Sequence, residues 1–95
     1  MFGLPQDSLA EIKGVLFNQK KVKTAIIYGS RAKGNYREGS DIDLTLKGDL
    51  SYRNLVELSV ELDDLNLPWK IDLSIYDQIQ NKELREHIDR VGVVL

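Results

Sequence analysis

Residues 41–47 alternate strictly between polar and apolar side chains, which is the pattern of a β-strand with one buried face. Asp41 and Asp43 share the polar face, because residues two apart on a strand point the same way. Residues 69–76 show the same alternation, with Asp72 on the polar side. The two segments therefore predict two strands of one sheet that carry three aspartates on an uncovered face.

Other segments of the chain also have a recognisable pattern. Amphipathic helices are expected at residues 8–19, from 51 or 54 to before Pro68, and at 81–91, with extended segments at 22–28 and 93–95. A short helical turn is expected after Gly29, at the end of the first extended segment. This order predicts a mixed α/β fold (an α+β mixed sheet), in which three amphipathic helices cover one face of a sheet of about three strands.

Length and composition limit what else the chain can be. Its 95 residues, 42 % hydrophobic and 29 % charged, predict a single domain over residues 1–95. The absence of cysteine excludes disulfides and thiolate zinc sites. A net charge of −2 disfavours direct binding of long nucleic acid. No apolar run approaches the roughly 20 residues of a membrane helix, and no signal peptide is recognisable, so a cytoplasmic location without membrane contact is expected.

The stretch after the first extended segment has the composition of a phosphate-binding turn. Gly29 lets the backbone bend sharply and approach a ligand closely. Ser30 would begin a helical turn, where free backbone N–H groups attract anions. Arg31 and Lys33 add positive charge at the same place. We therefore expect Gly29, Ser30 and, less directly, Arg31 and Lys33 to contact phosphate.

The three aspartates have the composition of a metal site. Two ionised carboxylates on one face of a strand repel each other unless a cation lies between them. Asp41, Asp43 and Asp72 together supply hard oxygen ligands of the kind that Mg²⁺ prefers. Two such ions could activate an attacking hydroxyl and hold the leaving phosphates. A phosphate-binding turn beside this site predicts nucleotidyl transfer.

These residues carry a resemblance to a known family. Gly29 and Ser30, ten intervening residues and then Asp41-Ile42-Asp43 resemble the signature of the DNA polymerase β superfamily of nucleotidyltransferases. The short chain and its Gly-Ser-Arg-Ala-Lys-Gly motif are similar, more narrowly, to the minimal nucleotidyltransferases. The strand around Asp72 resembles the third-carboxylate strand of that family. The resemblance implies that the three aspartates act as catalytic metal ligands, that the Gly-Ser turn binds nucleotide phosphate, and that ATP is the substrate.

The resemblance also implies a partner. Minimal nucleotidyltransferases are typically encoded beside a HEPN-domain RNase toxin and act as its antitoxin, in some cases by transferring AMP from ATP to a tyrosine of the toxin. We expect no appended acceptor-binding domain in a chain of this length, so the acceptor is expected to come from another molecule. Two alternatives stay open: a non-catalytic antitoxin that neutralises its partner by binding, and nucleotidyl transfer to a small-molecule acceptor.

Several residues also have purely structural interpretations. Asp72 could form an ion pair with Lys70 or Arg31. Ser40 is expected to shape the turn before its strand. His87 is expected on the surface of the last helix and not as a catalytic base, because metal activation makes a base less necessary.

Overall fold

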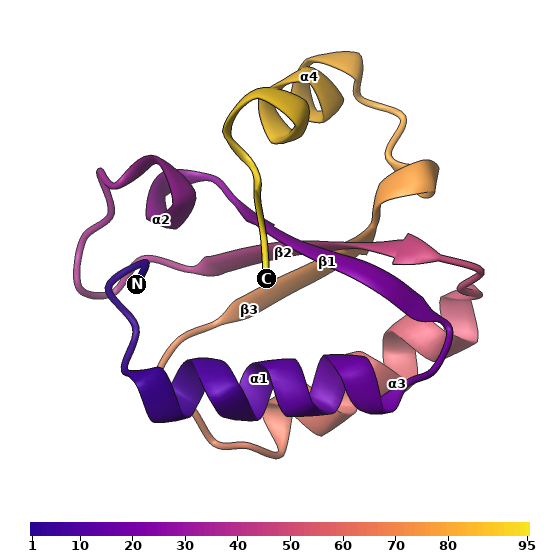
Figure 1. Cartoon of the computed structure of the whole chain (residues 1–95), viewed down its shortest axis with the longest axis horizontal. Coiled ribbons are helices and arrows are strands. Elements are labelled where there is room, and N and C mark those ends of the chain that lie inside the picture. Colours follow the sequence, from indigo (N-terminus) through magenta and orange to yellow (C-terminus); the bar gives the residue numbers. More distant parts are fainter.

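The computed structural model describes residues 1–95 and contains one sheet flanked by helices on both sides (Figure 1). The helices are α1 (Gln6–Asn18), α2 (Ser30–Lys33), α3 (Tyr52–Asp63) and α4 (Lys82–Val91), with a 3₁₀ turn, η1 (Tyr76–Gln78). The strands are β1 (Val22–Tyr28), β2 (Ile42–Gly48), β3 (Ile71–Ile75) and β4 (Val93–Val94). The mixed α/β class expected from the sequence is confirmed.

The sheet has four strands in the order β3-β2-β1-β4, one more than the three expected. β1 runs antiparallel to β2 and β4, whereas β2 and β3 are parallel. The extra strand is the tail, where Leu95 N–H donates to the Ala25 carbonyl at 2.9 Å. The tail was expected to be extended, but two paired residues are too few for their alternation to predict a strand.

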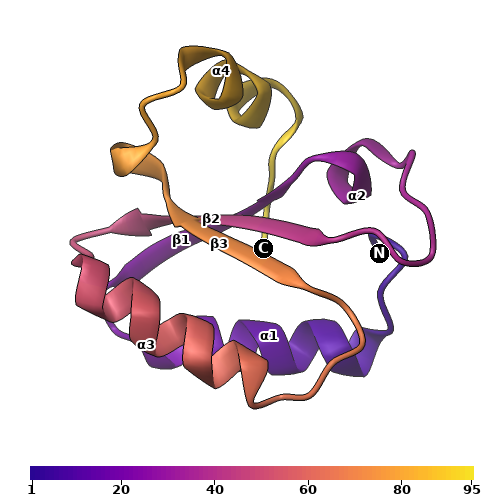
Figure 2. The same cartoon turned by 180° about the vertical axis from the view of Figure 1, so that it is seen from behind.

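The larger part of the core lies between the sheet and the two long helices, α1 and α3, which share one face (Figures 1 and 2). Helices α1 and α3 contribute Ile12, Leu16, Leu58 and Leu62, and the strands contribute Ala25, Ile27, Leu44 and Leu46. All eight side chains are buried. The apolar faces of the amphipathic helices and strands expected from the sequence therefore form this core.

Helix α4 covers the opposite face, so the expectation of three helices on one face is wrong (Figure 1). A second, smaller cluster forms there from Ile26, Tyr28, Tyr76 and Ile88. The reason lies in β1, whose residues are buried without interruption over its last four positions. A strand with both faces covered shows a continuous apolar run and not an alternating one.

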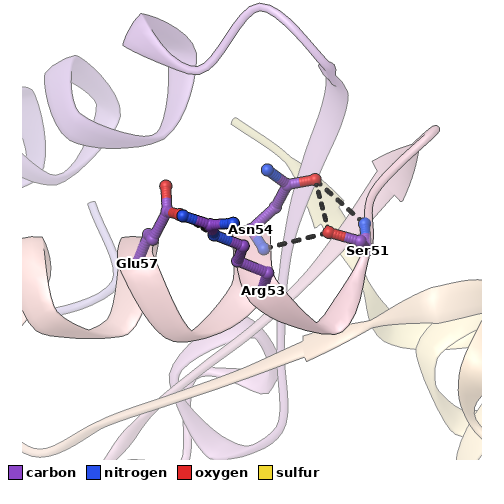
Figure 3. Close-up of polar contacts among 4 residues, drawn as sticks. All are labelled: Ser51, Arg53, Asn54 and Glu57. Atoms are coloured by element: carbon purple, nitrogen blue, oxygen red, sulfur yellow. Dashed lines mark hydrogen bonds and ion pairs between the residues drawn. The ribbon is translucent and has the colours of Figure 1, made fainter.

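The ends of the helices follow local capping chemistry. Helix α3 begins at a reciprocal capping box, in which Asn54 N–H donates to Ser51 Oγ at 3.2 Å and Ser51 N–H donates to Asn54 Oδ1 at 3.0 Å (Figure 3). Helix α4 begins where Leu84 N–H donates to Asn81 Oδ1 at 3.1 Å. None of the helices has both the length and the apolar character needed to cross a lipid bilayer.

Candidate functional site

Three residues in register form a row across the sheet. Asp43 on β2 is paired with Tyr28 on β1 and with Asp72 on β3. Residues paired across neighbouring strands point to the same side of a sheet, so all three side chains lie on the face that α4 partly covers. Asp41 stands two residues before Asp43, directly ahead of β2, and its negative charge acts on the Asp43 carboxyl. The structure thus brings the three predicted acids together, and we call Asp41, Asp43 and Asp72 the acidic row.

Asp43 is the most constrained of the three acids. Its carboxyl is half-buried, and burial raises its pKa above the ordinary value. The negative charges of Asp72 and Asp41 raise that pKa further, while the nearby His87 lowers it. Asp41 and Asp72 are exposed. The surroundings of Asp43 therefore destabilise its ionised form, and a nearby cation would offset this effect.

The donor set suits a divalent cation. All three groups are carboxylates, the hard oxygen ligands that Mg²⁺ prefers. No group of three Asp, Glu or His side chains is arranged closely enough to hold an ion as the side chains stand. The strands that carry Asp43 and Asp72 are neighbours, however, and a cation would remove the repulsion that raises the pKa of Asp43. The residues fit a magnesium site on this chemistry.

The turn after β1 touches the same carboxylate. Gly29 has φ 74° and ψ −154°, a backbone conformation essentially restricted to glycine. A Cβ built on Gly29 would overlap Oδ2 of Asp43. Ser30 begins α2, and Gly34 closes it in the left-handed region with its N–H donating to the Ser30 carbonyl at 2.9 Å. The predicted phosphate turn and the acidic row therefore adjoin.

The two basic residues of the motif have different environments. Lys33 is the last residue of α2 and is exposed, with no ion-pair partner. Arg31 is 2 % exposed and donates to the carbonyl oxygens of Phe2, Glu38 and Ser40. Lys33 is free to reach a ligand, whereas the Arg31 guanidinium donates to backbone oxygens and forms no ion pair with any of the three aspartates.

Two residues that lie at the site, Tyr28 and His87, were not predicted to belong to it. The Tyr28 ring meets the His87 ring edge-on, with 6.2 Å between centroids and 78° between planes. Burial raises the pKa of Tyr28, a hydrogen bond with Ser74 lowers it, and the charges of Asp43 and Asp72 raise it. The expectation of His87 at the helix surface is wrong, because the half-buried ring lies beside the row. Its position three residues after the apolar Leu84 was the available signal.

Other structural interpretations are settled by contacts. Ser40 shapes the turn as expected, since its Oγ accepts from Arg37 N–H at 2.7 Å. Asp72 forms no ion pair with Lys70 or Arg31; the chain's one salt bridge joins two residues of α3. Asp72 is therefore free for another partner.

Comparison with known proteins places the chain among nucleotide-transferring enzymes. The family model described as "Polymerase beta, Nucleotidyltransferase" matches residues 10–95. A Methanocaldococcus jannaschii protein assigned as protein adenylyltransferase MJ0126 is 35 % identical over 91 residues, with 86 % of this chain and 92 % of that protein covered. One from Haemophilus influenzae assigned as protein adenylyltransferase MntA is 29 % identical over 94 residues, with 97 % and 82 % covered. The chain belongs to the polymerase beta nucleotidyltransferase family.

Solved structures show the same fold. A chain of a toxin–antitoxin complex with AMP-PNP superposes with a TM-score of 0.71 at 19 % identity, covering 96 % of this chain and 72 % of that one. A chain of a complex between tri-AMPylated Shewanella oneidensis HEPN toxin and its MNT antitoxin gives a TM-score of 0.69 at 20 % identity, covering 94 % and 69 %. The expected polymerase β-like fold is confirmed.

Proposed function

We propose that this chain is a Mg²⁺-dependent adenylyltransferase that transfers AMP from ATP to a tyrosine hydroxyl of a HEPN-domain toxin, and that it thereby acts as the antitoxin of that toxin. The observation that carries the proposal is the Gly29 backbone lying against the carboxylate of Asp43, which is itself paired with Asp72. We place the reaction in the cytoplasm.

The comparisons support the nucleotide and the partner. The relatives in Methanocaldococcus jannaschii and Haemophilus influenzae are assigned as protein adenylyltransferases, which transfer AMP to protein. The solved neighbours are toxin–antitoxin complexes, one with the ATP analogue AMP-PNP and one with an AMPylated HEPN toxin. The AMPylated HEPN toxin is a second protein in complex with its MNT antitoxin, in agreement with an acceptor supplied by another molecule.

Each group at the site has a role in this reaction. Asp41, Asp43 and Asp72 would hold two Mg²⁺ ions, as in two-metal sites, and the backbone of Gly29 and Ser30 would hold the triphosphate. When bound, the metal supplies a lowered pKa for the attacking hydroxyl and positive charge for the leaving group. The tyrosine hydroxyl gives up its proton to water, and its oxygen bonds to the α-phosphorus. The bond between the α-phosphorus and the oxygen that bridges to the β-phosphate breaks, which releases pyrophosphate.

Mass spectrometry of the toxin tests the proposal. The toxin incubated with this chain, ATP and Mg²⁺ should gain the mass of AMP. The double variant Asp41→Asn, Asp43→Asn should lower the rate at least about 100-fold, because it removes charge that holds the metal. The matched control is Asp63→Asn, Asp64→Asn, which changes the net charge equally at two exposed acids away from the row. Circular dichroism checks that both variants fold.

The outcomes separate the candidate functions. Normal AMP transfer by the Asp41, Asp43 variant would contradict the assignment of these acids. Loss of transfer with retained neutralisation of the toxin would favour an antitoxin that works by binding. ATP consumption with small hydroxyl compounds, and none with the toxin, would favour a small-molecule acceptor.

A further inference from the structure

Arg31 is the only charged residue buried in the chain, and it has no acidic partner. Its side chain is 2 % exposed, and the chain's one salt bridge does not include it. Buried charge is costly unless hydrogen bonds and other charges compensate it. The groups that compensate the buried charge of the Arg31 guanidinium therefore indicate its role.

Backbone oxygens and aromatic rings take the place of an acid. Arg31 Nε and Nη2 donate to the Ser40 carbonyl at 3.0 and 2.8 Å, Nη1 donates to the Phe2 carbonyl at 2.9 Å, and Nη2 also donates to the Glu38 carbonyl at 3.3 Å. Four of the five N–H groups of the guanidinium are thus used. Its carbon lies 5.2 Å from the centre of the Tyr36 ring and 5.7 Å from that of Trp69.

These contacts, which we name the Arg31 cluster, join three separate segments: the turn at residues 1–4, the loop at 34–41 and the approach to β3. Trp69 reinforces it by donating from Nε1 to the Glu38 carbonyl at 3.3 Å. The Tyr36 ring lies against Gly3, where a Cβ would overlap it. The loop itself is exposed almost throughout. Arg31 is therefore the centre of the contacts that fix this loop to the body of the protein.

The anchored segments lead directly into the site. Ser40, which accepts two of the four hydrogen bonds, immediately precedes Asp41. Trp69 stands three residues before Asp72, and the Lys70 carbonyl between them accepts from Ile42 N–H at 2.9 Å. The Arg31 cluster thus sets where β2 and β3 start.

We propose that Arg31 is a positioning residue of the nucleotidyltransferase site: it holds the starts of β2 and β3 so that Asp41 meets Asp43 and Asp72, and it does not contact the nucleotide phosphates. The inference rests on the proposed function, because it concerns the metal that these acids bind. Replacing a residue that orients metal ligands typically lowers metal affinity or activity about 10–100-fold.

Metal binding, measured without turnover, tests the proposal. The probe is Mn²⁺, with the free ion followed by electron paramagnetic resonance, and the variants are Arg31→Gln and Arg31→Lys. Both variants should weaken Mn²⁺ binding about 10–100-fold, because neither side chain has the planar guanidinium that donates to several carbonyls at once. Lysine keeps the positive charge, so its failure to restore binding would show that the geometry matters and not the charge. Arg53→Gln is the matched control, since Arg53 is exposed and bonded only to Glu57 (Figure 3). It should stay within about twofold of the unaltered protein.

Two further measurements distinguish positioning from phosphate contact. At saturating metal, both Arg31 variants should lower kcat and leave the KM for ATP within about threefold, whereas loss of a phosphate contact raises KM, and lysine then restores much of it. Trp69 is the only tryptophan, so its emission should shift to longer wavelength in both Arg31 variants and not in the Arg53 control.

Each result supports or overturns the inference. Unaltered Mn²⁺ binding in Arg31→Gln, or a raised KM that Arg31→Lys restores, overturns it. If the Arg31 variants do not fold, Trp69→Phe decides: weaker Mn²⁺ binding supports the cluster, and binding equal to that of the unaltered protein overturns it. If the unaltered protein binds no Mn²⁺ and transfers no AMP, the proposed function fails as well. If the unaltered protein does both and only the Arg31 variants behave differently from the prediction, the inference about Arg31 fails and the proposed function stands.

Discussion

Replacing Gly29 with alanine should disturb the backbone and the acidic row together. The φ of 74° and ψ of −154° at Gly29 cost a residue with a Cβ about 1–3 kcal/mol. The new Cβ would also overlap Oδ2 of Asp43, and overpacking of this kind costs about 1–3 kcal/mol. We expect the free energy of unfolding to fall by about 2–6 kcal/mol in total. The free energy of unfolding of a chain of this length is about 5–14 kcal/mol. A loss of about 2–6 kcal/mol therefore leaves the variant folded over most of that stability range.

A double-mutant cycle with Asp43→Ala separates the two contributions. Without the Asp43 carboxylate the overlap disappears, and Gly29→Ala should then cost only the backbone part, about 1–3 kcal/mol. The difference between the two backgrounds, about 1–3 kcal/mol, is the coupling between turn and carboxylate. Urea unfolding followed by the emission of Trp69 measures all four proteins.

Gly34→Ala is the matched control at the other end of α2. Gly34 also has a positive φ, 91°, but a Cβ there would meet nothing within 4 Å. It should cost about 1–2 kcal/mol and show no coupling with Asp43. The rate of AMP transfer should fall about 100-fold in Gly29→Ala, because a shift of about 1 Å in the position of reacting groups has an effect of that size. It should fall far less in Gly34→Ala. Equal costs of Gly29→Ala with and without the Asp43 carboxylate would refute the argument that turn and acid touch.

Two other substitutions give distinct readouts. In EDTA at neutral pH, Asp43→Asn should raise Tm: burial and like charges raise the pKa of Asp43 in the folded state, so the folded state loses stability as pH rises through that pKa. The gain should vanish below about pH 4, where the carboxyl is protonated in both states, and a gain independent of pH would contradict this cause. Ser51→Ala should lower the free energy of unfolding by about 1 kcal/mol through loss of the capping box, leaving AMP transfer unchanged; urea unfolding and the transfer assay check both, and a lowered transfer rate would show that α3 matters to the site.

Much of the site could be predicted because it depends on local geometry. The period of two along a strand puts Asp41 and Asp43 on one side wherever the strand lies, and the same rule orients Asp72 on its own strand. The start of the last helix, expected at residue 81, depends likewise on a local contact, because Leu84 N–H donates to Asn81 Oδ1 three positions away. Such features need only the backbone of a short segment, which its own sequence determines.

The sequence by itself determined which faces of the strands carry the acids and where the chain must bend at Gly29. Only the tertiary structure decided that β2 and β3 are parallel neighbours in register, that α4 brings His87 to the acidic row, and that Arg31 turns inward to the Phe2 carbonyl. Phe2 lies 29 residues from Arg31 along the chain, so no local pattern reports their contact. The physical reason is that a side chain's partners in a folded protein are set by packing between distant segments, whereas its direction on a strand is set by the backbone at that residue.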